Sequence, residues 1–344
     1  MKAAVIKKHG GPEVVKIENA EKPIAKPGEV VIEIHSAALN HLDIWVRNGR
    51  GDRELTRPQI LGSDASGVII GKGSGVQRVN TGDEIVINPA LSCGQCEFCI
   101  RGQNSKCLSF GIVGMVRNGT FAEKIAVPYT NVWPKPAHLS FDEAAALPLA
   151  YQTAWRMMMT RAKMKPSDTI LIHGIGGGVA LACLQFAKLF GAEVIITSSS
   201  DEKLEKAKEL GADYRINYKK TSNIAETVRE LTKNRGVDIV IDSVGAATFE
   251  IDLSVARRGG RIVLCGVTTG ANTQANLHKI YWNQLSVLGS TMGSNEDFRQ
   301  MLKAVNNNKL KPVIDSIYPL DDTGKAMTKM ERGEQFGKII LKVK

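Results

Sequence analysis

The stretch Thr169–Ser200, TILIHGIGGGVALACLQFAKLFGAEVIITSSS, decides the fold of this 344-residue chain. An apolar run is followed by a glycine-rich turn, then by a segment with helical spacing of apolar residues, and then by a second apolar run. A strand, a turn, a helix and a second strand in this order form a βαβ unit whose strands lie parallel in one sheet. The sequence therefore predicts an α/β domain with a doubly wound parallel sheet.

The same alternation extends on both sides of this stretch. We expect helices at 139–159, 201–210 and 224–232, and strands at 214–216, 238–242 and 261–265. Ser140 and Glu143 have the spacing of a capping box, which starts the first of these helices. We assign residues 146–295 to this domain.

The turn itself is typical of a dinucleotide site. Glycines let the backbone approach a pyrophosphate, which free amide groups and the helix dipole then hold. The residues expected to do this are Gly174, Gly176, Gly177, Gly178 and Val179. Further cofactor contacts are expected at Asp242, Gly245, Gly266, Val267 and Met292, which follow strands of the same sheet, and at Thr153 in the preceding helix.

The end of the second strand indicates which dinucleotide binds. An NAD site usually has an acidic residue there, on the ribose 2′-hydroxyl. This chain has hydroxyl side chains at Ser198 and Ser199, followed by Lys203, and Tyr218 ends the next short strand. Because hydroxyl groups and a cation suit a 2′-phosphate, the sequence favours NADPH.

The first part of the chain has a different pattern. Short strands separated by Gly and Pro are expected at 2–6, 14–17, 29–37, 66–72 and 84–87, and they alternate apolar and polar residues as antiparallel strands do. A helix at 296–311 and a strand at 336–343 follow the parallel sheet. We assign residues 1–145 and 296–344 to a second domain, a small β-barrel.

Four cysteines interrupt this pattern in the run SCGQCEFCIRGQNSKC, at Cys93, Cys96, Cys99 and Cys107. Four thiolates at this spacing form a closed tetrahedral site, which leaves no position for chemistry. The sequence predicts one structural zinc per chain, held in a lobe at about 90–112. The other two cysteines, Cys183 and Cys265, lie in apolar surroundings and are expected to be buried.

Composition restricts the function classes. A hydrophobic content of 43% and a charged content of 23% are typical of a globular protein. The sequence shows no membrane-length apolar run and no secretory signal, and the cysteine usage fits a reducing compartment, so we expect a cytoplasmic protein. The net charge of +10 is spread along the chain, which makes nucleic acid an unlikely partner and fits anionic small molecules.

Together these segments resemble the medium-chain dehydrogenase/reductase superfamily, over essentially the whole chain. The resemblance rests on the cysteine lobe and on the ordered segments PEVVKIENAEKP (12–23), AALNHLDIWVRNG (37–49), PQILGSDASGVI (58–69), AAALPLAYQTAW (144–155) and IGGGVA (175–180). It implies a GroES-like β-barrel catalytic domain, a Rossmann domain and a C-terminal return to the barrel, where Lys338 approaches the cofactor. Members commonly form homo-oligomers, so a dimer or tetramer is expected.

The resemblance also shows what this chain lacks. Zinc-dependent alcohol dehydrogenases of the superfamily hold a catalytic zinc at three positions that match Asn40, Ser63 and Leu149. An amide, a hydroxyl and a hydrocarbon do not form such a site. His41, Asp43 and Asp64 lie nearby in sequence and could hold a metal in another way. Asn40, Asp43, Trp45 and Arg47 instead match the quinone oxidoreductase branch, with Trp in place of the usual Tyr.

Without a catalytic zinc, hydride transfer is easier to an acceptor that spreads the resulting negative charge. The resemblance therefore implies an NADPH-dependent reductase of quinones or α,β-unsaturated carbonyl compounds, with a small-molecule substrate. Asn40 is the candidate hydrogen-bond donor to the substrate or the nicotinamide ribose. Asp43 is expected to orient the adjoining loop, and Tyr151 either lines the pocket or packs in the core.

Three alternatives stay open. The first is an alcohol or aldehyde dehydrogenase with a rebuilt metal site. The second is an enoyl thioester reductase, in which Arg47, Arg50 and Arg53 either line a channel for coenzyme A phosphates or are ordinary surface residues. The third is a non-enzymatic, nucleotide-dependent RNA-binding protein.

Overall fold

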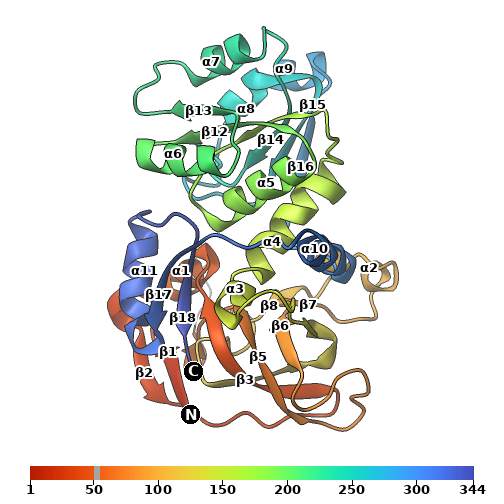
Figure 1. Cartoon of the computed structure of the whole chain (residues 1–344), viewed down its shortest axis with the longest axis vertical. Coiled ribbons are helices and arrows are strands. Elements are labelled where there is room, and N and C mark those ends of the chain that lie inside the picture. Colours follow the sequence, from red (N-terminus) through yellow and green to blue (C-terminus); the bar gives the residue numbers. More distant parts are fainter. Residues whose placement is uncertain (50–54) are drawn as a thin grey trace. The chain divides into compact units, whose positions relative to one another are not determined.

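The computed structural model describes residues 1–49 and 55–344 (Figure 1). The chain divides into two compact units, Met1–Ala150 with Ser294–Lys344, and Tyr151–Gly293. The sequence analysis places the two boundaries at 145/146 and 295/296. Among the described residues, no helix has both the length and the apolar character needed to cross a membrane.

The second unit contains the predicted doubly wound sheet. Its six strands are all parallel and lie in the order β13-β12-β11-β14-β15-β16, which is the Rossmann order (Figure 1). The strands are β11 (Thr169–Ile172), β12 (Glu193–Ser198), β13 (Tyr214–Asn217), β14 (Val237–Asp242), β15 (Ala256–Leu264) and β16 (Ser286–Gly289). The helices between them are α5 (Gly178–Leu189), α6 (Asp201–Glu209), α7 (Ile224–Leu231), α8 (Phe249–Val255) and α9 (Leu277–Trp282).

The first unit is built mainly on antiparallel strands. The last strand of the chain belongs to the main sheet of this unit. The main sheet has the order β10-β6-β5-β3-β18-β17, with β9 paired to β3, and β2-β1-β4 and β7-β8 form smaller sheets. Its strands are β1 (Lys2–Ile6), β2 (Lys16–Asn19), β3 (Glu29–Ala38), β4 (Gln59–Ile60), β5 (Asp64–Lys72), β6 (Glu84–Ile87), β7 (Ala90–Leu91), β8 (Gly111–Ile112), β9 (Lys124–Pro128), β10 (Val132–Pro134), β17 (Ile314–Pro319) and β18 (Lys338–Lys342).

Short helices connect these strands. They are α1 (His41–Asn48), α2 (Glu97–Ile100), α3 (Phe141–Ala145), α10 (Asn295–Asn308) and α11 (Thr323–Glu331), with 3-10 turns at Pro12–Val14, Asn104–Lys106, Tyr129–Asn131 and Leu320–Asp322. The first 3-10 turn explains why the predicted strand at 14–17 begins only at Lys16. Apolar side chains of β3, β5, β6 and β9 fill the core of the unit, among them Ile32, Ile69 and Ile85.

The predicted helix at 139–159 is not continuous. Ser140 and Glu143 form the expected capping box on α3, but α3 ends at Ala145 and α4 (Pro148–Trp155) starts at a proline. Proline lacks the amide hydrogen that a continuous helix needs, although it fits the first turn of a new one. Beyond α4 the backbone widens into a π-helix at Arg156–Arg161.

Arg47 at the end of α1 is neither a surface residue nor part of a channel. Its side chain is fully buried, pairs with Glu331 of α11, and donates from Nε to the carbonyl of Gly10 at 3.0 Å. A coenzyme A channel through this residue is therefore wrong. Arg50 and Arg53 lie outside the described residues.

Arg47→Met is expected to lower the free energy of unfolding by about 3 kcal/mol, because it leaves a carboxylate and a buried carbonyl without their partner. Denaturant unfolding of the whole chain measures the loss. The control is Arg332→Met, since Arg332 is exposed and only 3.9 Å from its partner Glu334. Equal unfolding midpoints for both variants would contradict the buried role of Arg47.

Candidate functional site

A buried lysine organises the region of the first unit where the candidate catalytic residues lie. The Lys338 ammonium, at the start of β18, donates to the Leu39 carbonyl at 2.8 Å, to Asn40 Oδ1 at 2.6 Å and to Asp64 Oδ2 at 3.0 Å. An ammonium group has three hydrogens, so each of them has an acceptor. Lys338 is 3% exposed and Asp64 0%.

Asp64 joins the remaining parts of this cluster. Its Oδ2 atom also accepts from the Asn40 amide at 2.9 Å, and its Oδ1 atom accepts from the backbone amide of Leu149 at 2.8 Å. One carboxylate thus holds together the start of β5, the first residue before α1 and the first turn of α4. The sequence analysis considered Asp64 only as a metal ligand and missed this linking role.

Asn40 and Asp43 start α1 as a reciprocal pair. Asn40 is the N-cap, and its backbone amide donates to Asp43 Oδ2 at 2.7 Å. The pKa of Asp43 is raised to about 7, mainly because the carboxyl group is buried; the hydrogen bond from the Asn40 amide opposes this rise and the nearby Asp64 carboxylate adds to it. This geometry fits the expected orienting role of Asp43. Asn40, at the N-terminus of α1, remains the candidate hydrogen-bond donor to the substrate or the nicotinamide ribose.

The three positions that match catalytic zinc ligands hold other interactions. Asn40 is bonded to Lys338 and Asp64, Ser63 Oγ donates to the Val113 carbonyl at 2.8 Å, and Leu149 contributes its backbone amide. Within residues 1–49 and 55–344, the cysteine cluster is the one group of three or more His, Cys, Asp or Glu side chains close enough to share a metal ion.

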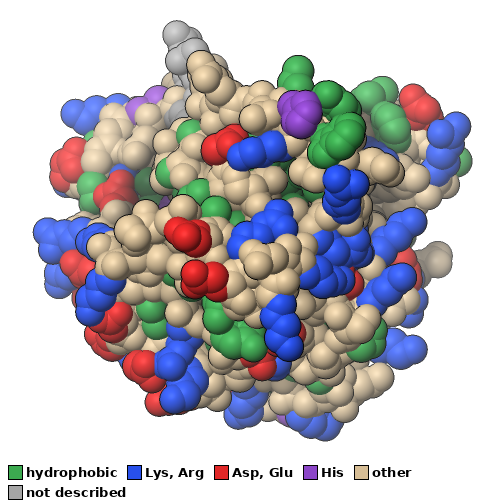
Figure 2. All heavy atoms as spheres, turned by 90° about the horizontal axis from the view of Figure 1, so that it is seen from above, with side chains coloured by type: hydrophobic (Ala, Val, Ile, Leu, Met, Phe, Trp, Pro, Cys, Tyr) green, Lys and Arg blue, Asp and Glu red, His purple; other side chains and the backbone are tan. Residues whose placement is uncertain are grey.

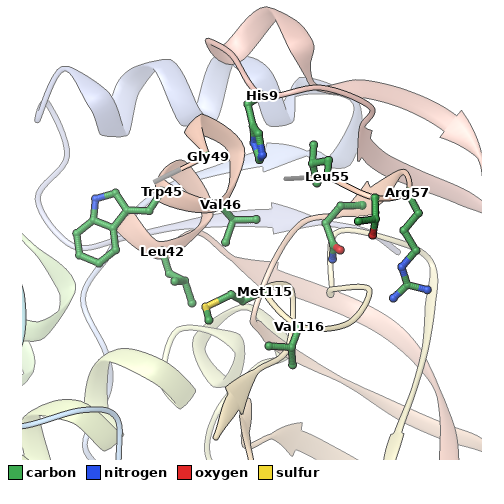
Figure 3. Close-up of a pocket in the computed structure, with 11 residues that line it drawn as sticks. His9, Leu42, Trp45, Val46, Gly49, Leu55, Arg57, Met115 and Val116 are labelled. Atoms are coloured by element: carbon green, nitrogen blue, oxygen red, sulfur yellow. The ribbon is translucent and has the colours of Figure 1, made fainter. Parts of the chain in front are cut away.

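A pocket of about 330 Å³ lies beside α1 (Figure 3). Figure 3 shows the Leu42 and Met115 side chains close together at one end, and the Trp45 indole turned away from the other lining side chains. The lining residues, all from the first unit, are His9, Leu42, Trp45, Val46, Gly49, Leu55, Thr56, Arg57, Gln59, Met115 and Val116. A volume of this size is sufficient for a small ligand.

The four cysteines of the lobe converge. Their sulfur atoms all lie within 4.8 Å of one another. Backbone amides of Cys96 and Ser109 donate to Cys93 Sγ and Cys107 Sγ, at 3.4 and 3.3 Å, and such donors stabilise thiolates. A four-thiolate group of this kind fits a structural zinc with no open coordination position.

In the second unit the glycine turn has the predicted shape. Gly174 and Gly176 have φ of 67° and 119°, a region that side chains disfavour. Gly177 is the N-cap of α5 and provides no side-chain cap, so the amides of Gly178 and Val179 face the end of the helix without an internal partner. This is the arrangement that binds a pyrophosphate.

The residues expected near the ribose 2′ position also lie together. The Tyr218 amide donates to the Ser198 carbonyl at 3.0 Å, which places Tyr218 beside the end of β12. Lys203 lies in the first turn of α6, and Ser199 is half-buried. Asp201, the first residue of α6, is paired with Lys220 and accepts from Asn217 at 2.6 Å.

The remaining predicted cofactor residues follow the carboxyl ends of the strands, but they differ in exposure. A Cβ on Gly245 would lie 3.0 Å from Val267, so the loops after β14 and β15 pack closely, and Gly266 is similarly near Ser243. Met292 is buried with φ of 46°, and its sulfur lies 3.9 Å from Thr153 Oγ1.

Two predicted residues need correction. Asp242 is fully buried, and its carboxylate accepts from the amides of Val244 and Gly245, so it shapes the turn and does not present its side chain to a ligand. Tyr151 is 1% exposed, and its hydroxyl donates to Gln185 Oε1. Of the two roles considered for Tyr151, the geometry favours core packing.

Comparisons with known proteins agree with this architecture. Residues 26–137 match the alcohol dehydrogenase GroES-like domain family, and residues 178–307 match the zinc-binding dehydrogenase family. A zinc-type alcohol dehydrogenase-like protein of Schizosaccharomyces pombe is 32% identical over 92% of this chain and 91% of its own. The human quinone oxidoreductase is 27% identical over 99% of this chain and 97% of its own.

Solved structures are similar as well. A crystal structure of an NAD-dependent alcohol dehydrogenase superposes with a TM-score of 0.96 at 42% identity, over 100% of both chains. A crotonyl-CoA carboxylase/reductase superposes with a TM-score of 0.93 at 28% identity, over 100% of this chain and 88% of its own. From its matched domains and its full-length relatives, we conclude that this chain is an oxidoreductase that belongs to the medium-chain dehydrogenase/reductase superfamily, among the zinc-type alcohol dehydrogenase-like proteins.

Proposed function

We propose that this protein is an NADPH-dependent reductase that transfers hydride to a quinone or an α,β-unsaturated carbonyl compound without a catalytic zinc. The observation that carries the proposal is the bonding of Lys338 to Asn40 and Asp64. Two of the three positions that match catalytic zinc ligands of the superfamily take part in this cluster, Asn40 through its side chain and Leu149 through its backbone amide.

Electrostatics disfavours a divalent ion in this cluster. The Asp64 carboxylate already faces one cation, and its other oxygen is taken by the Leu149 amide. A zinc ion placed among these groups would lie a few ångströms from a buried ammonium, where repulsion is strong because the local dielectric is low. The side chains at the three matching positions also include no thiolate, imidazole or carboxylate.

The acceptor class follows from this arrangement. NADPH supplies a hydride, which adds to a carbon of the acceptor and forms NADP⁺, while the negative charge that develops spreads into an enolate or phenolate. Among the described residues, the second hydrogen of the Asn40 amide has the Ala38 carbonyl as its acceptor, at a long 3.5 Å, so this hydrogen is the one that would bond that oxygen. A proton from water then completes the reduced product.

The pocket beside α1 supports an acceptor with an apolar body. Leu42, Val46, Met115 and Val116 provide its apolar walls. Arg57 is exposed at this pocket. A ring or short chain that fills the apolar part would leave its polar groups near the solvent side.

The alternatives have specific points for and against them. An alcohol dehydrogenase is favoured by the similar NAD-dependent structure, but the three ligand positions here oppose it. An enoyl thioester reductase loses the support of Arg47, which is buried in an ion pair. For RNA binding, the face in Figure 2 shows Lys and Arg interspersed with Asp and Glu, which does not favour a polyanion groove.

NADPH, the structural zinc, the homo-oligomer and the cytoplasmic location are parts of the same proposal. The hydroxyl groups at Ser198 and Ser199 with Lys203 support NADPH, and the adjoining carboxylate of Asp201 is paired with Lys220. β16 is the last strand of its sheet, and Val287 on it is 38% exposed, which leaves an edge for a second copy of the chain.

Steady-state oxidation of NADPH against benzoquinone, an enone, crotonyl thioester and a simple aldehyde tests the acceptor class. We expect kcat/KM for the quinone or enone to exceed that for the aldehyde by about a hundredfold, since only the former delocalise the charge. Turnover with the aldehyde alone, inhibited by a chelator, would overturn the proposal.

In the same assay, Lys338→Met is expected to lower kcat/KM by at least about tenfold, because it leaves the Asp64 carboxylate buried and unpaired and releases Asn40. The control is Lys342→Met on the same strand, because Lys342 is about half exposed and pairs only with Asp142. Similar kinetics for both variants would show that the cluster is not part of the site.

Ser199→Asp is expected to weaken NADPH binding by about a hundredfold and to leave NADH binding within about threefold, because a carboxylate repels the 2′-phosphate. Binding titrations with both cofactors measure this. Lys208→Gln, at an exposed position on α6, also changes the charge by one unit but lies away from the site, and it should alter neither affinity. Equal losses for both cofactors would contradict the assignment.

Metal analysis of the purified protein is expected to find about one zinc per chain. Cys99→Ser should lose this zinc and lower the unfolding temperature, because Cys99 is a buried member of the cluster. Cys183→Ala, which changes a buried cysteine of α5, should keep the zinc. Two zinc ions per chain would contradict the proposal.

A further inference from the structure

A chain of buried polar side chains lies beneath the glycine turn of the second unit. The Gly174 amide donates to Thr197 Oγ1 at 3.3 Å, and the same oxygen lies 3.1 Å from His173 Nδ1. His173 Nε2 lies 2.9 Å from Oδ1 of Asp252 on α8. His173, Thr197 and Asp252 are at most 2% exposed. The dinucleotide turn is thus tied, through two side chains, to a buried carboxyl group.

The chain continues to a second loop of the same sheet. The Asp252 carboxyl interacts with the Asp242 carboxyl, and Oδ2 of Asp252 has no donor among the described residues. Asp242 in turn accepts from the amides of Val244 and Gly245 and from Thr248 Oγ1 at 2.9 Å. In the part of the chain that the structure describes, neither carboxyl group bonds to a lysine or arginine.

Two buried carboxyl groups in contact, without a cation, retain one proton between them. With that proton on Asp252, every member of the chain has a consistent role. Asp252 donates to Asp242 and accepts from His173 Nε2, His173 Nδ1 accepts from the Thr197 hydroxyl, and the Thr197 oxygen accepts from Gly174. This assignment needs a neutral imidazole, and burial lowers the pKa of His173 to about 4.

We propose that Thr197, His173, Asp252 and Asp242 are positioning residues for the dinucleotide, and that they hold the Gly174 turn and the Val244–Gly245 turn in register as long as one proton stays between the two aspartates. The proposal rests on the dinucleotide binding of the superfamily and is independent of the acceptor. None of the four side chains needs to contact the cofactor, because the two turns they fix carry the backbone groups that do.

The pH dependence has a defined sign. Burial and, after it, the Asp252 charge raise the pKa of Asp242 to about 6, and burial raises the pKa of Asp252 to about 7. The other titratable groups packed here, Cys265 and Cys183, stay neutral because burial raises the pKa of both thiols. Above about pH 7 the shared proton is lost and two anions face each other, so cofactor affinity falls as pH rises.

Three variants test this hydrogen-bonded chain in the whole protein. Asp252→Asn places an amide donor toward Asp242 and a carbonyl toward His173, so it keeps the chain but removes its proton equilibrium. Thr197→Val removes the hydroxyl at nearly constant volume, and Thr197→Ser restores it. The measurements are the dissociation constants of NADH and NADPH between about pH 6 and pH 9, with the unfolding temperature of the cofactor-free protein. NADH is included because it has no 2′-phosphate to titrate.

We expect the wild type to bind both cofactors about tenfold more weakly at the upper end of this range than at the lower end, and Asp252→Asn to bind with little change across it. Thr197→Val should bind about tenfold more weakly than the wild type at every pH, and Thr197→Ser within about threefold. A wild-type affinity that does not depend on pH, or an Asp252→Asn slope equal to the wild-type slope, would overturn the proposal.

Folding and binding effects are separable in this design. If Thr197→Val only loosened the core, its unfolding temperature would fall while its dissociation constants at low temperature stayed at the wild-type value, and this too would overturn the proposal. If Thr197→Val does not fold, the comparison of Asp252→Asn with the wild type decides alone. No acceptor enters the experiment, so its failure is distinct from failure of the proposed reductase activity.

Discussion

The interaction on which the first unit depends is the burial of the Lys338 ammonium. A buried ammonium is tolerated only where an anion and further acceptors surround it. Here the acceptors come from the end of β3, the N-cap of α1 and the start of β5. The pairing of β18 with β3, the start of α1 at His41 and the position of Asp64 therefore depend on one another. The C-terminal strand completes a cluster whose other side chains, Asn40 and Asp64, lie before residue 65.

In the first unit, the Lys338 ammonium balances the charge of the buried Asp64 carboxylate. In the second unit, by our proposal, a proton does this for the buried pair Asp242 and Asp252. Asp64 faces an ammonium, while Asp242 and Asp252 face each other. An ammonium is not a Lewis acid, so in the proposed reaction the acceptor itself has to spread the developing negative charge. A shared proton, by contrast, exchanges with solvent, so the proposed link between the two cofactor turns depends on pH.

The sequence was sufficient for the elements with strong periodicity and for the residue types at the site. The glycine turn, the parallel strands and the cysteine lobe each carry a local signal, and these were predicted. Local signals could not reveal that Arg47 is buried against Glu331, or that Lys338 and Asp64 meet, because these partners are far apart in the chain. Asp252 offered one signal that was missed: it lies three residues after Phe249 on α8, on the face that carries the buried apolar residues.

The cysteine lobe has a structural role, which explains its presence in a chain that has no residues of the zinc-ligand type at positions 40, 63 and 149. Asn104, in the turn between Cys99 and Cys107, bonds to Ser92 and accepts from the Asn295 amide, and Asn88 donates to the Asn295 side chain. Asn295 is the first residue of α10, where the chain re-enters the first unit. Four thiolates around one metal ion would hold this turn in place, so loss of the lobe would loosen the start of α10. The residues at positions 40, 63 and 149 are anchored in another way, because Asn40 bonds to Lys338 and Asp64, Ser63 donates to the Val113 carbonyl and the Leu149 amide donates to Asp64. These positions therefore also stabilise the first unit, through hydrogen bonds.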